Sequence, residues 1–141
     1  MQQPFPAISA QVGAALPVIS RTMGYPVLKS RTWSGINPIH WDPEYARALG
    51  FPGPLVTGQI FTAYMQEMAV GFFGTHFFER SSFDCRYVKP GYLGDTVKTG
   101  GVITDREPVE GGVKLTADVW CENQDGVRIV TGVITCVTPA A

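Results

Sequence analysis

The sequence lacks an excess of charge of either sign: 11 lysine and arginine residues stand against 12 aspartate and glutamate residues, for a net charge of −1. Proteins that bind nucleic acid through a basic face carry clustered positive charge, and this composition gives no sign of such a partner. The sequence also lacks an apolar run near the roughly 18 residues that a membrane span needs. Its N-terminal segment has neither the basic start nor the apolar stretch of a secretory signal, so we expect a cytoplasmic protein with no membrane partner.

Cysteine and histidine are scarce, with three cysteines and two histidines. Cys85, Cys121 and Cys136 are odd in number, widely spaced and each within a strand-like segment, which is typical of reduced core residues rather than of disulfides or metal ligands. His76 lies far from His40 in sequence, and no Cys-x-x-Cys pair is present. The sequence therefore implies neither a metal site nor a resident cofactor.

The remaining composition is that of an ordinary globular protein, with 45% hydrophobic and 16% charged residues. A chain of 141 residues falls within the usual size of one domain and buries roughly two thirds of its unfolded surface. We therefore expect a single domain that spans residues 1–141.

The second half of the chain has the pattern of β-strands. Residues 113–122 alternate between apolar and polar side chains, the period-2 pattern of a strand with one face on a core. The turn-forming residues 123–126 separate this strand from a β-branched run over 127–137, so the two form a hairpin. The turn residues Glu110-Gly111-Gly112 join it to an earlier strand near 97–105, and residues 83–88 supply another. We predict an antiparallel meander of four strands.

The middle of the chain has the pattern of helices. Between residues 60 and 72 the apolar side chains recur at helical spacing, which predicts one long, mostly buried helix. Thr57 and Gly58 mark its start, and Gly71 and Gly74 mark its end. The fold class predicted from the helix and the strands is α+β, with an antiparallel sheet wrapped around one long central helix.

A shorter helix is predicted over residues 43–49. Asp42 is a suitable N-cap residue, Pro43 fits the first helical position, and Glu44 makes the first turn acidic. Gly50 then stops the helix.

Several spaced motifs carry a resemblance to a known family. Residues 37–40 read Asn-Pro-Ile-His, residues 42–46 read Asp-Pro-Glu-Tyr-Ala, and residues 50–53 read Gly-Phe-Pro-Gly; Val-Thr-Gly follows at 56–58. Downstream, residues 88–97 contain a proline and then a Gly-Asp turn. In this order the motifs resemble the MaoC-like (R-specific) enoyl-CoA hydratases and dehydratases of hot-dog fold.

The resemblance implies syn addition or loss of water across the double bond of an acyl thioester, carried on coenzyme A or acyl carrier protein. His40 would exchange a proton with the water, with Asn37 beside it in the catalytic motif and expected to hold the loop by side-chain hydrogen bonds. The N–H of Gly58, at the start of the long helix, would meet the thioester oxygen as it gains charge. Thr57 directly precedes Gly58 and would also contact the substrate. Many members of the family carry histidine at this position.

One departure from the family pattern concerns the second catalytic group. The family's aspartate lies five residues before the histidine, and that position is Gly35 here. An alternative alignment pairs Ser34 and Gly35 with the family's Ser-Gly and treats the aspartate as deleted. Either way the dyad is incomplete, and His40 is either half of an active site or an inherited histidine without chemistry.

Other carboxylates are weak substitutes for the missing aspartate. Asp42 and Glu44 lie where a helix N-terminus favours acidic residues for structural reasons. Asp84 lies on a strand whose polar face meets solvent or a partner. None of the three is therefore expected to complete the dyad.

The remaining candidates concern the substrate. Tyr64 and other aromatic residues in or after the long helix would suit an apolar acyl tunnel, although aromatic residues at helical spacing also occur as ordinary core. Arg86 and Lys89 would suit coenzyme phosphates, although charges on strands are commonly solvated.

Three functions remain open from the sequence. The first is an active hydratase or dehydratase of an enoyl or 3-hydroxyacyl thioester. The second is a non-catalytic or accessory subunit of a heteromeric MaoC-like hydratase that shapes the acyl tunnel. The third is altered thioester chemistry, such as hydrolysis, isomerisation or cyclisation. By analogy with the fold, we expect a homodimer or a heteromer with another hot-dog chain.

Overall fold

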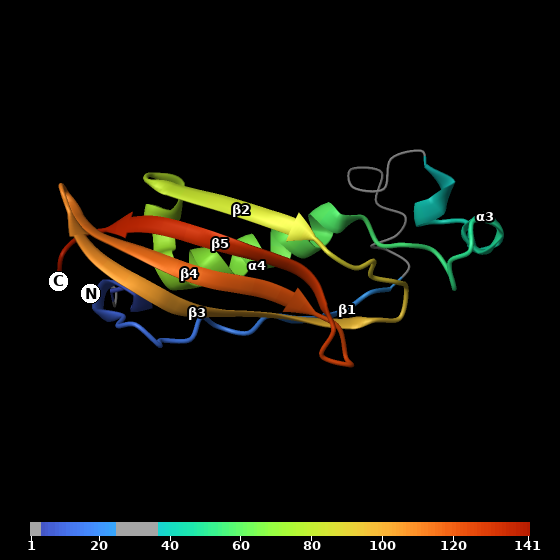
Figure 1. The fold of residues 1–141 in the computed structure, drawn as a ribbon, viewed down its shortest axis with the longest axis horizontal. Coiled ribbons are helices and arrows are strands. Elements are labelled where there is room, and N and C mark those ends of the chain that lie inside the picture. Colours follow the sequence, from blue (N-terminus) through green and yellow to red (C-terminus); the bar gives the residue numbers. More distant parts are fainter. Residues whose placement is uncertain (1–3, 25–36) are drawn as a thin grey trace.

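The computed structural model describes residues 4–24 and 37–141. In chain order the elements of these residues are η1 (Pro6–Ser9), β1 (Ser20–Thr22), η2 (Pro38–His40), α3 (Pro43–Ala48), α4 (Gly58–Phe73), η3 (Gly74–Phe78), β2 (Ser81–Tyr87), β3 (Thr96–Val109), β4 (Gly112–Glu122) and β5 (Arg128–Thr138). Figure 1 shows the curved sheet with the long helix α4 lying along one of its faces. The predicted α+β fold, an antiparallel sheet around one long helix, is confirmed.

The sheet differs from the predicted meander in the order of its strands. The described strands lie in the order β1-β3-β4-β5-β2, and every pair is antiparallel. Only β3, β4 and β5 form a meander, because the chain leaves β2 at one edge and returns beyond β4 to begin β3. The fifth strand, β1, was missed: it has three residues, all exposed, and so carries no hydrophobic pattern.

The hairpin between β4 and β5 is confirmed, and side-chain hydrogen bonds fix its turn. The Asn123 Oδ1 atom accepts hydrogen bonds from the N–H groups of Asp125 at 2.9 Å and Val127 at 3.1 Å. Gly126 has a φ of +72°, in the left-handed region that glycine tolerates best. The residues of the turn therefore fix the alignment of β4 with β5.

Both predicted helices are present. Asp42 caps α3, because its Oδ1 atom accepts from the N–H groups of Glu44 and Tyr45 at 3.0 and 3.2 Å. The longer helix, α4, follows Thr57 as expected, runs past Gly71 and ends at Phe73, with Gly74 at a φ of +66° as its C-cap residue. A glycine inside a helix is tolerated here because the opposite, buried face of α4 holds it on the sheet.

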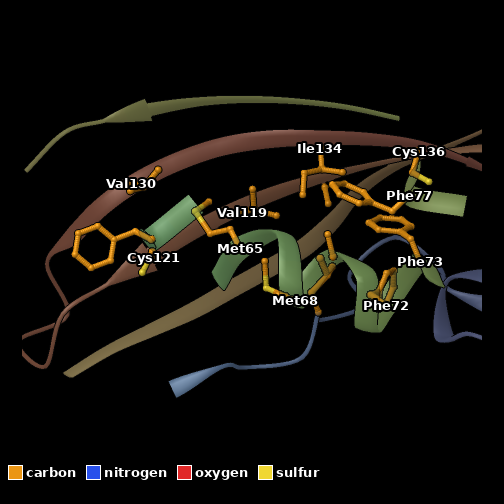
Figure 2. Packing of buried hydrophobic residues seen from close by; sticks show 14 of the residues in the cluster. Met65, Met68, Phe72, Phe73, Phe77, Val119, Cys121, Val130, Ile134 and Cys136 are labelled. Carbon is orange, nitrogen blue, oxygen red and sulfur yellow. The ribbon is translucent and has the colours of Figure 1, made fainter. Parts of the chain in front are cut away.

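The core lies between α4 and the sheet. Figure 2 shows Met65, Met68 and Phe73 of the helix against side chains of β4 and β5. All three side chains are fully buried. Phe72 and Phe73 pack edge to face, with ring centroids 5.0 Å apart. This contact surface is why the helix is hydrophobic over much of its circumference.

Two cysteines belong to this core. Cys121 and Cys136 are buried and free, and Cys85 is free and partly buried, as predicted for reduced core residues. Burial raises the pKa of the Cys121 thiol to about 12 and that of Cys136 to about 11. Both side chains therefore act as small apolar groups at neutral pH.

Within residues 4–24 and 37–141 no helix is long and apolar enough to cross a membrane. The single-domain organisation and the cytoplasmic compartment stay predictions.

We predict that Gly91→Ala lowers the free energy of unfolding by about 1–3 kcal/mol, through overpacking. A Cβ atom at Gly91 would lie 2.4 Å from the Phe61 ring and 3.4 Å from Ile129. The matched control is Gly53→Ala, where nothing lies within 4 Å and the change should stay within about 0.5 kcal/mol. Urea unfolding of both variants measures the difference, and equal stability would contradict this packing.

Candidate functional site

His40 lies at the end of the short helix η2, and its neighbour Asn37 holds the start of that turn. The Asn37 Oδ1 atom accepts a hydrogen bond from the N–H of Ile39 at 3.2 Å. The N–H of His40 in turn donates to the Asn37 carbonyl at 3.2 Å. Asn37 therefore positions the loop, as its residue type indicates, and a direct catalytic role for it stays a prediction.

Main-chain atoms of Leu55 fix the orientation of the His40 ring. The His40 Nδ1 atom lies 2.9 Å from the Leu55 carbonyl oxygen, and the Leu55 N–H donates to the Ile39 carbonyl at 3.0 Å. A carbonyl only accepts, so this contact places the proton of the neutral ring on Nδ1. The lone pair on Nε2 is then available to take a proton from a water or a substrate.

His40 borders a cavity of about 510 Å³, a volume within the usual range for small-molecule sites. The start of α4 borders the same cavity. Its lining consists of His40, Leu55, Val56, Thr57, Gly58, Gln59, Phe61, Tyr87, Val88, Lys89, Pro90, Gly91 and Ile129. Three of the predicted site residues are therefore brought together: His40 lies at the same cavity as the adjacent pair Thr57 and Gly58, although the histidine is far from that pair in sequence.

The first turn of α4 supplies the electrophilic side of this cavity. The N–H groups of a helix N-terminus have no partners within the helix and carry partial positive charge. Gly58 is the first residue of α4, and the side chain of the preceding Thr57 makes no capping hydrogen bond to the helix. The Gly58 amide is thus suited to an oxygen atom that gains negative charge.

Tyr87 lies against this helix start, a contact that the sequence reading missed. A Cβ atom at Gly58 would lie 2.6 Å from the Tyr87 Cε1 atom, so the ring occupies the space that a side chain there would need. The Tyr87 hydroxyl lies 3.4 Å from the Thr62 Oγ1 atom, one turn further along α4. Gly58 is therefore required by the Tyr87 ring as well as by any close approach of a ligand.

No signal in the sequence distinguished Tyr87 from other strand residues. It ends β2 directly before the Val88 to Gly91 segment that matched the family motif, and that position was the available hint. Lys89 and Gln59 also border the cavity with exposed side chains. Lys89 is the one lysine or arginine of the described lining, and its charge would suit an anionic group of a ligand.

The described lining contains no carboxylate. Ser34 and Gly35, on which the interpretation of the missing aspartate rests, lie outside the described residues. Asp42 has its carboxylate engaged in capping α3, and Glu44 is exposed. Asp84 lies on β2 and borders a different depression, on the outer face of the sheet. None of these three lines the cavity beside His40.

Two predicted substrate-binding residues lie away from the cavity. Tyr64 is in the middle of α4, with the Arg21 guanidinium 5.8 Å from its ring centroid, and burial raises the pKa of its hydroxyl. Arg86 borders the depression on the outer face of the sheet, together with Asp84, Asp118 and Arg128. The structure does not bring either residue to His40.

Metal ligands are not grouped in the described part of the chain. Within residues 4–24 and 37–141, no cluster of three or more His, Cys, Asp or Glu side chains is placed to hold an ion. The chemistry available from the described lining is proton transfer at His40 and charge stabilisation at the start of α4.

Comparisons with known proteins place this geometry in context. A family model described as "MaoC like domain" matches residues 32–125. No curated protein matches the sequence.

Solved structures show the same fold at low identity. R-hydratase PhaJ1 from Pseudomonas aeruginosa has a TM-score of 0.80 at 20% identity, over 97% of this chain and 87% of that chain. The (R)-hydratase from A. caviae involved in PHA biosynthesis has a TM-score of 0.77 at 22% identity, over 93% and 98%. The ChsH1-ChsH2 complex from Mycobacterium tuberculosis has a TM-score of 0.73 at 23% identity, over 91% and 98%. These similarities establish the hot-dog fold.

We predict that the effect of Gly58→Ala on the free energy of unfolding changes sign with the residue at position 87. With Tyr87 present, the added methyl group displaces the ring and lowers the free energy of unfolding by about 1–3 kcal/mol. In a Tyr87→Ala background the same change should stabilise by up to about 1 kcal/mol, because alanine favours the helix more than glycine does. Thermal unfolding of the four proteins measures this coupling, and equal effects in both backgrounds would contradict the contact.

Proposed function

The chain belongs to the family of MaoC-like domains, and we propose on this premise that it adds water to an enoyl thioester or removes it from a 3-hydroxyacyl thioester. The observation that carries the proposal is the shared cavity of His40 and the start of α4. The Leu55 carbonyl orients the His40 ring and leaves its Nε2 atom to act as the base. The Gly58 amide supplies the hydrogen-bond donor that stabilises the developing negative charge. Coenzyme A or acyl carrier protein would carry the acyl group.

A single imidazole is sufficient for a syn addition. His40 Nε2 takes a proton from water while the oxygen forms a bond to C3 of the enoyl group. The π electrons of the double bond move toward the thioester carbonyl, whose oxygen becomes an enolate that accepts a hydrogen bond from Gly58. The imidazolium then returns its proton to C2 on the same face, which restores the thioester. Dehydration is the reverse sequence.

The surroundings of the cavity fit this substrate class. Phe61, Val56 and Ile129 are buried and give the site an apolar floor for an acyl chain. Exposed Lys89 lies at the border of the cavity, where phosphates of the carrier would be solvated. Arg86 has no place in this proposal, because it lies on the outer face of the sheet, away from the cavity.

We predict that His40→Ala lowers kcat/KM for hydration of crotonyl-coenzyme A or a longer enoyl-coenzyme A by about 10²- to 10⁴-fold. The loss reflects removal of the base, so substrate binding should change less than turnover. Asp42→Ser is the matched control: it removes a nearby carboxylate but keeps a side chain that caps α3, and it should retain activity. Unchanged hydration in His40→Ala would contradict the proposal, and equal losses in both variants would point to Asp42 instead.

A second candidate function is favoured by one observation, the lack of a carboxylate in the described lining. If catalysis needs a full Asp/His pair, this chain would be an accessory subunit that shapes the acyl tunnel of a heteromer. One of the structures with the same fold is a complex of two chains, ChsH1 and ChsH2.

The two functions predict different behaviour of the purified chain. An active hydratase should hydrate an enoyl-coenzyme A by itself, whereas an accessory subunit should be inactive alone and gain activity only with a second hot-dog chain. Affinity purification of the tagged chain from its own cells, followed by mass spectrometry and a hydration assay of both preparations, separates them. Full activity of the chain alone excludes the accessory role, and release of free thiol without hydration would indicate altered thioester chemistry.

A further inference from the structure

The ring of Tyr87 lies on the start of α4, at the cavity that His40 borders. A Cβ atom at Gly58 would lie 2.6, 2.8 and 3.3 Å from the Cε1, Cδ1 and Cζ atoms of this ring. Tyr87 and His40 both line the cavity of about 510 Å³. In Figure 1 the tip of the β2 arrow, where Tyr87 ends the strand, lies near the start of α4. The ring therefore packs against the residue whose amide the proposed reaction uses.

Main-chain hydrogen bonds hold the ring in this place. Directly after Tyr87, the Val88 N–H donates to the Ile129 carbonyl of β5 at 2.8 Å. Three residues further on, the Gly91 carbonyl accepts from the Val56 N–H at 2.8 Å, two residues before α4 begins. The segment that carries the ring is thus tied to the sheet at one end and to the helix start at the other.

The hydroxyl group of Tyr87 is directed along α4. Thr62 donates its single hydroxyl proton from Oγ1 to the Gln59 carbonyl at 3.0 Å. The Tyr87 hydroxyl lies 3.4 Å from the same Oγ1 atom, so it is the donor in that contact. This distance is longer than the roughly 2.7–2.8 Å of a strong O–H···O bond, and the contact is weak. Carbon atoms of the ring, rather than the hydroxyl, are therefore what Tyr87 presents to Gly58.

An apolar wall at this position affects how well an amide stabilises charge. Water competes for the N–H group at an open helix N-terminus, and it screens any charge placed there. In a site that excludes water, the same N–H stabilises a developing oxyanion far more strongly, and removal of one such donor costs about 10²- to 10³-fold in kcat. The Tyr87 ring is 54% exposed, so it stands between solvent and the Gly58 residue that it covers.

We propose that Tyr87 is a positioning residue for the hydration reaction, and that its ring shields the Gly58 amide from bulk water so that the thioester oxygen is the acceptor. The inference rests on the proposed function of the cavity. It assigns no proton transfer to Tyr87, because its hydroxyl contacts Thr62. The ring acts on the reaction through Gly58, and its effect is greatest when the oxygen carries most charge.

Substitutions at position 87 separate the ring from its hydroxyl. Tyr87→Ala should lower kcat for hydration of crotonyl-coenzyme A about tenfold or more, with KM within about threefold, because the lost interaction strengthens only in the transition state. Tyr87→Phe keeps the ring and should stay within about threefold in both constants, and Tyr87→Leu should fall between the two. Tyr45→Ala is the matched control, since Tyr45 is an exposed tyrosine outside the described lining. Steady-state kinetics measures all four variants.

A second readout does not need turnover. Butyryl-coenzyme A has no double bond to hydrate, and a carbon-13 label at its thioester carbonyl gives a separate infrared band. A hydrogen bond from Gly58 in a water-poor site polarises this carbonyl and lowers its stretching frequency. The original protein and Tyr87→Phe should share the lowered frequency, whereas Tyr87→Ala should return the band toward its position in water. Difference infrared spectroscopy of the bound ligand measures the shift.

The outcomes separate this inference from the proposed function. A kcat that is equal in Tyr87→Ala and the original overturns the inference, and so do equal losses in Tyr87→Ala and Tyr87→Phe, which would assign the effect to the hydroxyl. If the original protein hydrates no enoyl thioester, the proposed function fails and the infrared band decides: a shift that depends on the ring supports the shielded amide, and a band that does not move overturns it. Circular dichroism checks folding, and Tyr87→Leu replaces Tyr87→Ala if the latter does not fold.

Discussion

The main chain around Leu55 is the constraint on which the candidate site depends. Its N–H and carbonyl groups bond to Ile39 and to the His40 imidazole, and the next residue, Val56, donates to the Gly91 carbonyl at 2.8 Å. Helix α4 begins two residues later. Three hydrogen bonds therefore join the histidine loop, the segment after β2 and the helix start into one unit, and the relative positions of base and amide follow from them.

The strand β2 links this unit to the edge of the sheet. Its last residue, Tyr87, lies on the start of α4, while Asp84 and Arg86 lie free on the outer face of the same strand. One face of this seven-residue strand therefore borders the candidate site, and its other face lies on the outside of the sheet.

Much of the fold followed from the sequence because local patterns carry it. Alternation over β4, the Asn123 turn and the Asp42 cap each act within a few residues, and each was found. The position of β2 beside β5 depends on a contact far along the chain, and β1 is too short to show a pattern. In the site, the motifs predicted that His40 and Gly58 act together. The contact of Tyr87 with α4 and the outward position of Arg86 depend on how β2 packs, and no local pattern encodes that packing.

The most direct test of the site is a crystal structure with a bound 3-hydroxyacyl-coenzyme A. The account predicts the thioester oxygen about 2.7–3.1 Å from the Gly58 nitrogen, the distance of a charge-stabilising donor. It also predicts the 3-hydroxyl group within hydrogen-bond distance of His40 Nε2, while Nδ1 stays on the Leu55 carbonyl. An acyl thioester bound away from this cavity, or bound in it with the hydroxyl turned from His40, would contradict the account.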